Sequence, residues 1–201
     1  MAKILNWLSS YSIRYARESV LRRTPHVMHL HTMRTGRPNQ LPSSTLKSSL
    51  NQLHYVGGGV VVYYLDANSI SIGCNTQLRD YAILEVGGAL TIGSDCVIGA
   101  YNWVQASGKV EFGEGVITGP HCSFISTSHQ HVEPGASVGE TALIRGRVKI
   151  GNNVWIGANV SVLMGVTIGD NVTIGSGSVV THDIPTNTIA YGAPCRVQRA
   201  K

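Results

Sequence analysis

The feature that most constrains this chain is a six-residue repeat between residues 150 and 180. A β-branched residue occupies every sixth position, usually with glycine behind it, and a second apolar residue follows most of them by four positions. The first set is Ile150, Ile156, Val162, Ile168, Ile174 and Val180, and the second is Val154, Val160, Val166 and Val172. Neither a helix nor a half-buried strand has this period, whereas a hexapeptide β-helix does. The repeat predicts one short strand per hexad, with β-branched side chains inside a triangular prism and glycines where the chain turns its corners.

The same repeat begins earlier in the chain, near Val56, with longer coils. Apolar-glycine pairs recur every 20 residues there, instead of every 18, at Ile72, Ile92 and Phe112. Two extra residues per coil fit an enlarged corner, at Gly87-Gly88 and at Ser107-Gly108. We therefore expect an all-β solenoid, a parallel β-helix, over residues 56–199.

The six-residue period is interrupted after Phe124. The next in-phase pair is Ile150-Gly151, but residues 130–146 contain no hexads and include Pro134-Gly135. We interpret residues 126–147, with approximate bounds, as a loop extruded from the solenoid. Long excursions from a regular scaffold are where functional residues tend to lie.

Residues 1–55 precede the repeat and are strongly basic. The whole chain has a net charge of +5, and residues 1–50 hold eight Lys or Arg against one Glu, a balance of 8 − 1 = +7. Apolar positions within residues 4–23 predict an amphipathic helix or helix pair, and residues 25–49 are interpreted as an irregular arm. Packing on the repeat or on a neighbouring subunit is favoured over peripheral membrane contact, because the apolar face is thin. Nucleic-acid binding has no support beyond charge.

Composition and cysteine spacing narrow the class of protein further. Charged residues make up only 13% of the chain and 23 residues are glycine, which suits a solenoid. No apolar run approaches the roughly 18 residues that cross a bilayer, and the first residues turn polar too soon for a signal peptide. The four cysteines, Cys74, Cys96, Cys122 and Cys195, are far apart and form no CxxC pair. They predict reduced, mostly buried thiols and a cytoplasmic protein.

The segment from Ile150 to Arg199 carries the most specific pattern in the chain, IGNNVWIGANVSVLMGVTIGDNVTIGSGSVVTHDIPTNTIAYGAPCRVQR. It resembles the C-terminal half of the hexapeptide acyltransferases, and the resemblance extends over residues 56–199. The sequence is similar to maltose, galactoside and nodulation-factor O-acetyltransferases and to acetyltransferases of surface-polysaccharide gene clusters. This resemblance implies a left-handed parallel β-helix, a homotrimer, acetyl-CoA as acyl donor, and an active site between adjacent subunits.

His129 stands at the mouth of the expected loop. A histidine on a rigid scaffold is a candidate general base, because its ordinary pKa is near neutrality. Residues 119–129 resemble the GPN-(x)n-T-x-H segment that delivers the catalytic histidine in the family. The resemblance implies that His129 takes the proton of an acceptor hydroxyl as it attacks the thioester directly, in a ternary complex. It also implies an acceptor-binding role for Asn102, although a buried asparagine ladder would have the same sequence.

The resemblance also implies a coenzyme A surface. Its candidate residues are Trp155, Ala158, Met164, Gly165, Ser176 and His182. The backbone amide of Ala158 matches the position that binds the thioester in relatives, and such a donor suits a developing oxyanion. Relatives usually have Lys or Arg at the position of His182 and Pro at that of Met164. Arg196, with Arg199 and Lys201, is therefore a further candidate for the coenzyme phosphates.

These inferences predict an acetyl-CoA-dependent O-acetyltransferase that acts on a hydroxyl of a sugar or surface-glycan precursor in polysaccharide biosynthesis. The alternatives are an N-acetyltransferase of an amino sugar or antibiotic, and a non-catalytic β-helix scaffold. No metal is expected. His121, His129 and His131 lack the spacing of the three-histidine zinc site in γ-type carbonic anhydrases, which share this fold.

Overall fold

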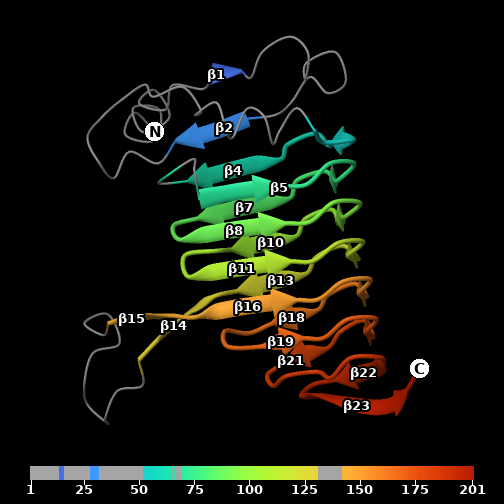
Figure 1. The fold of residues 1–201 in the computed structure, drawn as a ribbon. Helices are drawn as coiled ribbons and strands as arrows, with labels where there is room; N and C mark the ends of the chain where they lie inside the picture. The colour runs from blue at the N-terminus through green and yellow to red at the C-terminus, as the bar shows by residue number, and fades with distance from the viewer. Residues whose placement is uncertain (1–13, 16–27, 32–51, 65, 67–68, 131–141) are drawn as a thin grey trace, which may run out of the picture.

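The chain folds as a parallel β-solenoid. A computed structural model describes residues 14–15, 28–31, 52–64, 66, 69–130 and 142–201. Short strands stack coil upon coil along one axis, as Figure 1 shows, and confirm the all-β solenoid that the repeat predicts. No helix in the described part of the chain is long and apolar enough to cross a membrane.

Three parallel sheets form the faces of the prism. Face A contains β4 (Val61–Tyr64), β7 (Ile83–Val86), β10 (Trp103–Gln105), β13 (Ser123–Ile125), β18 (Ser161–Val162) and β21 (Val179–Val180). Face C contains β5 (Ile70–Ile72), β8 (Ala89–Ile92), β11 (Lys109–Phe112), β16 (Arg147–Ile150) and β19 (Thr167–Ile168). Face B contains β3 (Tyr55–Val56), β6 (Gln77–Leu78), β9 (Val97–Ile98), β12 (Ile117–Thr118), β17 (Trp155–Ile156), β20 (Thr173–Ile174), β22 (Thr188–Gly192) and β23 (Cys195–Ala200).

The interior of the prism is filled by the hexad residues. All six recurring residues between Ile150 and Val180, and all four of the second set, are buried. Each fully buried Val or Ile stabilises the fold by about 1.5–3 kcal/mol relative to exposure. Phe112 and Phe124 pack edge to face with ring centroids 4.8 Å apart, just before the break in the repeat. The predicted burial pattern is confirmed.

The corner between faces C and B, the Asn corner, is made by residues with positive φ. Asn75, Asp95, Gly115, Asn153, Asn171 and Asn187 occupy it in successive coils. Asparagine and aspartate tolerate this backbone conformation better than other side chains. The side chains also bond between coils, with the Asn153 Nδ2 donating to Asn171 Oδ1 at 2.8 Å and Asn171 Nδ2 donating to Asn187 Oδ1 at 3.0 Å. Gly115 interrupts this ladder.

The corner between faces B and A, the aromatic corner, also has positive φ but carries rings. Tyr81, Tyr101 and His121 have φ values of 59°, 58° and 59°. Their rings stack, with centroids 5.0 Å apart between Tyr81 and Tyr101 and 4.9 Å apart between Tyr101 and His121. The stacking stabilises a conformation that bulky residues rarely adopt.

The corner between faces A and C, the loop corner, contains Gly87-Gly88 and Ser107-Gly108, where the longer coils were predicted to turn. An added Cβ on Gly88 would lie 1.9 Å from the Gly108 carbonyl oxygen, so this position requires glycine. The extruded loop leaves the prism at the same corner. Its base is an antiparallel hairpin of β14 (Thr127–His129) and β15 (Leu143–Arg145), which points away from the stack in Figure 1.

The N-terminal arm differs from its prediction where it is described. Arg14–Tyr15 form strand β1, so the helix predicted over residues 4–23 is wrong at these two positions. Met28–His31 form strand β2, not irregular chain, and pair in parallel with β4 and antiparallel with β1. The physical reason is that the first strand of face A would otherwise leave its backbone donors and acceptors without sheet partners. The other residues of the helix and arm predictions up to Asn51 lie outside the described residues.

Gly115→Asn should stabilise the protein by completing the Asn ladder. Asparagine tolerates the φ of 64° at this position, and an added Cβ would be 3.9 Å from the nearest atoms of Asn153. Replacing glycine also lowers the entropy of the unfolded chain, so we expect a gain of about 0.5–1 kcal/mol in the free energy of unfolding. Denaturant unfolding midpoints measure it. Gly115→Val, which is strained at positive φ, is the matched control and should destabilise. A lower midpoint for the asparagine variant would contradict the ladder's role.

Thiol labelling of the folded protein should modify Cys74 and leave the other cysteines intact. Cys74 is exposed, whereas Cys96, Cys122 and Cys195 are buried, and burial raises the pKa of all three buried thiols. A raised pKa keeps a thiol protonated and unreactive at neutral pH. Peptide mapping after a brief alkylation should therefore find label at Cys74 alone, with all four cysteines labelled after denaturation. Equal labelling of Cys96 or Cys122 in the folded state would show that the core opens readily.

Candidate active site

His129 lies on the last residue of β14 and is exposed. It faces Leu143 across the hairpin, and the neighbouring Gln130 N–H donates to the Ala142 carbonyl at 3.2 Å. The hairpin thus holds the histidine outside the prism, as Figure 1 shows for β14. An exposed imidazole on an ordered strand can exchange protons with a bound molecule, as a general base must. His131 and the loop tip lie outside the described residues.

The base of this hairpin is anchored to face A. The Ser126 hydroxyl donates to the Gln105 carbonyl at 2.7 Å and accepts from the Gly108 N–H at 2.9 Å. The Thr127 hydroxyl donates to the Gln105 side-chain Oε1 at 2.7 Å. Ser126 and Thr127 are both buried. Gln105 therefore bonds two successive residues at the start of the hairpin, Ser126 and Thr127. The second of these lies two positions before His129.

The loop corner continues beyond the hairpin in the next two coils, where it contains Met164, Gly165 and His182. An added Cβ on Gly146 would be 2.4 Å from Met164 Cγ, and the Gly165 N–H donates to the Arg147 carbonyl at 2.9 Å. One coil further on, His182 Nδ1 lies 2.8 Å from the Thr181 hydroxyl. Because successive coils are about 4.8 Å apart, these positions form a column parallel to the solenoid axis.

Trp155 lies on a different side of the prism, on face B. Its side chain is 57% exposed and is flanked in register by Ile117, 48% exposed, and by Thr173. An exposed indole next to an exposed isoleucine is an apolar surface suited to a ligand or to another protein surface.

Ala158 and Ser176 meet at the aromatic corner. The Ala158 N–H, predicted to stabilise the oxyanion, donates to Ser176 Oγ at 3.1 Å. Ser176 packs so closely under this coil that a Cβ on Gly157 would be 2.5 Å from its hydroxyl. The amide can serve an oxyanion only when the Ser176 hydroxyl turns away from it.

Asn102 does not occupy an acceptor site. It is fully buried, its Nδ2 donates to the Thr118 hydroxyl at 2.6 Å, and its Oδ1 accepts from the Cys122 N–H at 2.8 Å. Both amide atoms are thus bonded inside the core, which corrects the acceptor-binding prediction for this side chain. Asn102 instead joins successive coils and satisfies buried polar groups.

Arg196 lies on β23, which pairs antiparallel with β22 at the C-terminal end of face B. Its Nη1 donates to the Cys195 carbonyl at 2.8 Å. Arg199 stands opposite Ile189 on the same hairpin, so the positive charge of the tail continues the surface that carries Trp155 and Thr173. Among the described residues, no three His, Cys, Asp or Glu side chains gather as metal ligands.

The structure therefore sorts the predicted site residues into two groups. His129, Met164, Gly165 and His182 follow the loop corner, whereas Trp155, Ala158, Ser176 and Arg196 lie on face B or at its corner with face A. Each group forms a surface of its own on the prism. Sequence analysis missed Gln105. The 20-residue length of the coils could have found it, because this spacing places Gln105 beside Ile125, where the loop begins.

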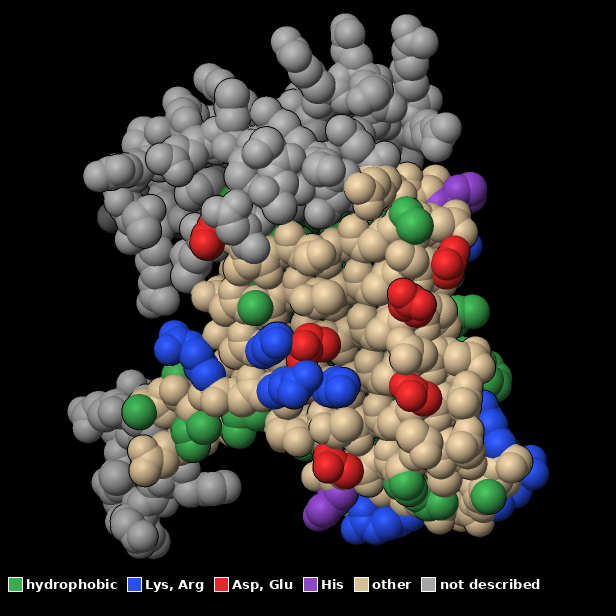
Figure 2. Space-filling model, in the orientation of Figure 1, with side chains coloured by type: hydrophobic (Ala, Val, Ile, Leu, Met, Phe, Trp, Pro, Cys, Tyr) green, Lys and Arg blue, Asp and Glu red, His purple; other side chains and the backbone are tan. Residues whose placement is uncertain are grey.

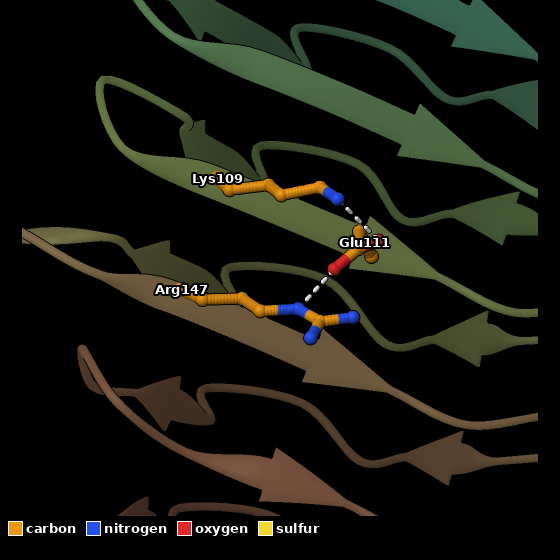
Figure 3. Close-up of polar contacts among 3 residues, drawn as sticks. All are labelled: Lys109, Glu111 and Arg147. Atoms are coloured by element: carbon orange, nitrogen blue, oxygen red, sulfur yellow. Dashed lines mark hydrogen bonds and ion pairs between the residues drawn. The ribbon is translucent and has the colours of Figure 1, made fainter.

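Sequence analysis also missed an ion-pair cluster on face C beside the loop corner. Glu111 accepts from Lys109 Nζ at 2.9 Å and from Arg147 Nε, as Figure 3 shows. Burial by itself would raise the pKa of Glu111, but hydrogen bonds and charge from Lys109 and Arg147 outweigh it and hold the pKa below its usual value. The carboxylate is therefore ionised at neutral pH. The coil spacing could have found this pairing, because Lys109 and Arg147 stand in register.

Comparison with known proteins places these features in context. Residues 147–182 match the family model described as bacterial transferase hexapeptide (six repeats). Galactoside O-acetyltransferase of Escherichia coli is 36% identical over 129 residues, which are 64% of this chain and 63% of that protein. A probable acetyltransferase of Mycobacterium tuberculosis is 34% identical over 145 residues, 71% of this chain and 48% of that protein.

The fold has solved counterparts as well. AntD, an N-acyltransferase from Bacillus cereus crystallised with dTDP and coenzyme A, aligns with a TM-score of 0.61 and 23% identity, over 79% of this chain and 89% of that one. The chain spans less than two thirds of the length of both enzymes named above from sequence comparison. The hexapeptide repeat and the solenoid of this chain are therefore similar to those of the hexapeptide-repeat acetyltransferases.

Proposed function

We propose that this protein is an acetyl-CoA-dependent O-acetyltransferase that modifies a hydroxyl of a sugar or surface-glycan precursor. The observation that carries the proposal is the exposed His129, held on an anchored hairpin that interrupts an otherwise regular family scaffold. Two relatives of the chain, from Escherichia coli and Lactococcus lactis, are galactoside O-acetyltransferases. A scaffold without chemistry would have no need of an exposed histidine fixed in this way.

In the proposed reaction, the His129 imidazole accepts the proton of the acceptor hydroxyl while that oxygen attacks the thioester carbonyl carbon. A hydroxyl is too weak an acid to ionise beforehand, so proton removal and attack proceed together. The carbon–sulfur bond then breaks, the acetyl group stays on the acceptor oxygen, and the coenzyme sulfur recovers a proton from the imidazolium. The Ala158 N–H is the proposed donor to the carbonyl oxygen at the moment when it carries negative charge.

We further propose that the complete site forms between two copies of the chain in a homotrimer. The loop-corner residues and the face B residues form separate surfaces in one chain. In the trimer, the loop corner of one copy would therefore lie opposite face B of its neighbour. Exposed Trp155 and Ile117 supply apolar area for such a contact. Coenzyme A would extend along the column from the hairpin past Met164 and Gly165, with its phosphates near His182 or near Arg196 of the adjoining copy.

Transfer to the amine of an amino sugar or antibiotic is the alternative, because the scaffold, the donor and the base would be shared. An O-acetyl ester is cleaved by hydroxylamine, whereas an N-acetyl amide is not, so the product separates the two reactions.

His129→Ala should abolish most acetyl transfer without weakening the binding of coenzyme A. Loss of a general base typically costs about 10²–10⁴-fold in rate. Chromatographic detection of coenzyme A released in the presence of a panel of galactosides and maltosides measures it, and calorimetry measures coenzyme binding. Gln130→Ala, at the next exposed position, is the matched control and should retain activity. Near-normal turnover of the His129 variant would remove this residue from the mechanism.

Gln105→Ala should lower kcat more than it raises the KM for acetyl-CoA, because it frees the strand that orients His129. Loss of the Thr127 bond removes a partly buried interaction worth about 1 kcal/mol, so we expect a several-fold to tenfold fall in kcat. Gln105→Glu, which still offers an acceptor to the Thr127 hydroxyl, should rescue part of it. Thr127→Val should match Gln105→Ala, while Thr127→Ser should not. Equal rates for all four variants would show that the anchor does not position the base.

A further inference from the structure

Positive charge on the described solenoid is concentrated beside the hairpin of His129. Four of the eight Lys and Arg side chains in residues 52–201 are Lys109, Arg145, Arg147 and Lys149. Figure 2 shows Lys and Arg side chains gathered around an acidic group on the face that Figure 1 presents toward the viewer. We name these four residues the basic row.

The basic row has a regular geometry. Arg147 and Lys149 alternate along β16 and therefore share its outer face about 7 Å apart, and Arg145 ends β15 two residues earlier in the chain. Lys109 stands beside Arg147 on β11, and Glu111 stands beside Lys149. All four basic residues are exposed.

Glu111 orders this surface without neutralising it. It bonds Lys109 and Arg147 and stays ionised, leaving four cations against one carboxylate, or 4 − 1 = +3. Arg147 contacts Glu111 through Nε, so its two outer nitrogens point away from the carboxylate, as Figure 3 shows. Thr167 lies one coil below Lys149, and its N–H donates to Oδ1 of Asp183, which lies one coil further on, at 2.7 Å.

The row leads directly to the proposed base. Arg145 pairs with Thr127 in the hairpin, and His129 pairs with Leu143 two residues away. From Leu143 to Lys149 the chain covers about 20 Å if extended, which is enough to contact several sugar units. A bound chain lying on the row would thus have one end at His129.

We propose that the basic row binds the negatively charged groups of the acceptor, so that the substrate is an acidic glycan chain carrying carboxylate or phosphate groups. Guanidinium and ammonium groups at regular spacing bind such oxygens and select against neutral chains. This proposal rests on the proposed function, since it assigns the acceptor to the site that contains His129. It places the acceptor on face C, apart from the coenzyme residues of the loop-corner column and face B.

Direct binding without acetyl-CoA tests the proposal. The probes are a fluorescent oligogalacturonate, a phosphorylated maltohexaose and neutral maltohexaose, measured by anisotropy at low and moderate salt. We expect wild-type protein to bind an acidic probe in a salt-dependent manner and to bind the neutral one at least tenfold more weakly. The double variant Arg145→Gln/Lys149→Gln leaves the Glu111 pairs intact and should lose roughly fivefold or more in affinity for the acidic probe, because two exposed cations no longer contact it.

Arg79→Gln, which removes a cation elsewhere on the solenoid, is the matched control and should bind as wild type does. Equal binding of neutral and acidic probes, or unchanged affinity in the double variant, would overturn the proposal. So would a double variant that loses affinity for coenzyme A or 3′,5′-ADP instead, because the row would then hold the donor phosphates. These measurements need no acetyl transfer, so a failure of the acetyltransferase proposal would show separately, as the absence of acetyl transfer from acetyl-CoA to any glycan by the wild-type protein.

Discussion

The structure depends on the burial of one β-branched side chain in every hexad. Each such residue packs against its equivalents in the coils above and below, so the interior is one continuous apolar column. This packing requires the chain to turn sharply between hexads, and the turns need glycine or a residue that tolerates positive φ. The Asn corner and the aromatic corner meet that requirement in different ways, with bonded amides in one and stacked rings in the other.

Because the interior of the solenoid is regular, we expect functional residues where the hexapeptide repeat is interrupted. The solenoid continues in register across the break, because β11 pairs with β16 although 34 residues separate Phe112 from Arg147. The inserted hairpin therefore leaves the strand pairing of the core unbroken. It places His129 outside the prism, and Gln105, Ser126 and Thr127 hold its root. An anchored excursion from a rigid scaffold is a suitable way to position the proposed base to within the tolerance that catalysis needs.

Sequence reasoning predicted the core well because burial in this fold follows a strict period. It identified the hexad residues of the core and the interruption after Phe124, where β14 and β15 pair outside the three faces. It was wrong at Arg14–Tyr15, where the unpaired edge of face A forms a sheet pair that periodicity cannot reveal. It was also wrong about Asn102, because outward and inward roles of an asparagine at a corner look alike in sequence. Gln105 and the basic row depend on neighbours 20 to 38 residues away, which become visible only once the coil register is known.

The central claim is that this scaffold transfers an acetyl group to a glycan hydroxyl through the hairpin of His129. The most direct measurement is mass spectrometry of glycans incubated with the protein and isotopically labelled acetyl-CoA, before and after hydroxylamine treatment. The account predicts a labelled acetyl group on the glycan that hydroxylamine removes as an ester. Label that resists hydroxylamine, or no label on any glycan while coenzyme A still binds, would contradict it.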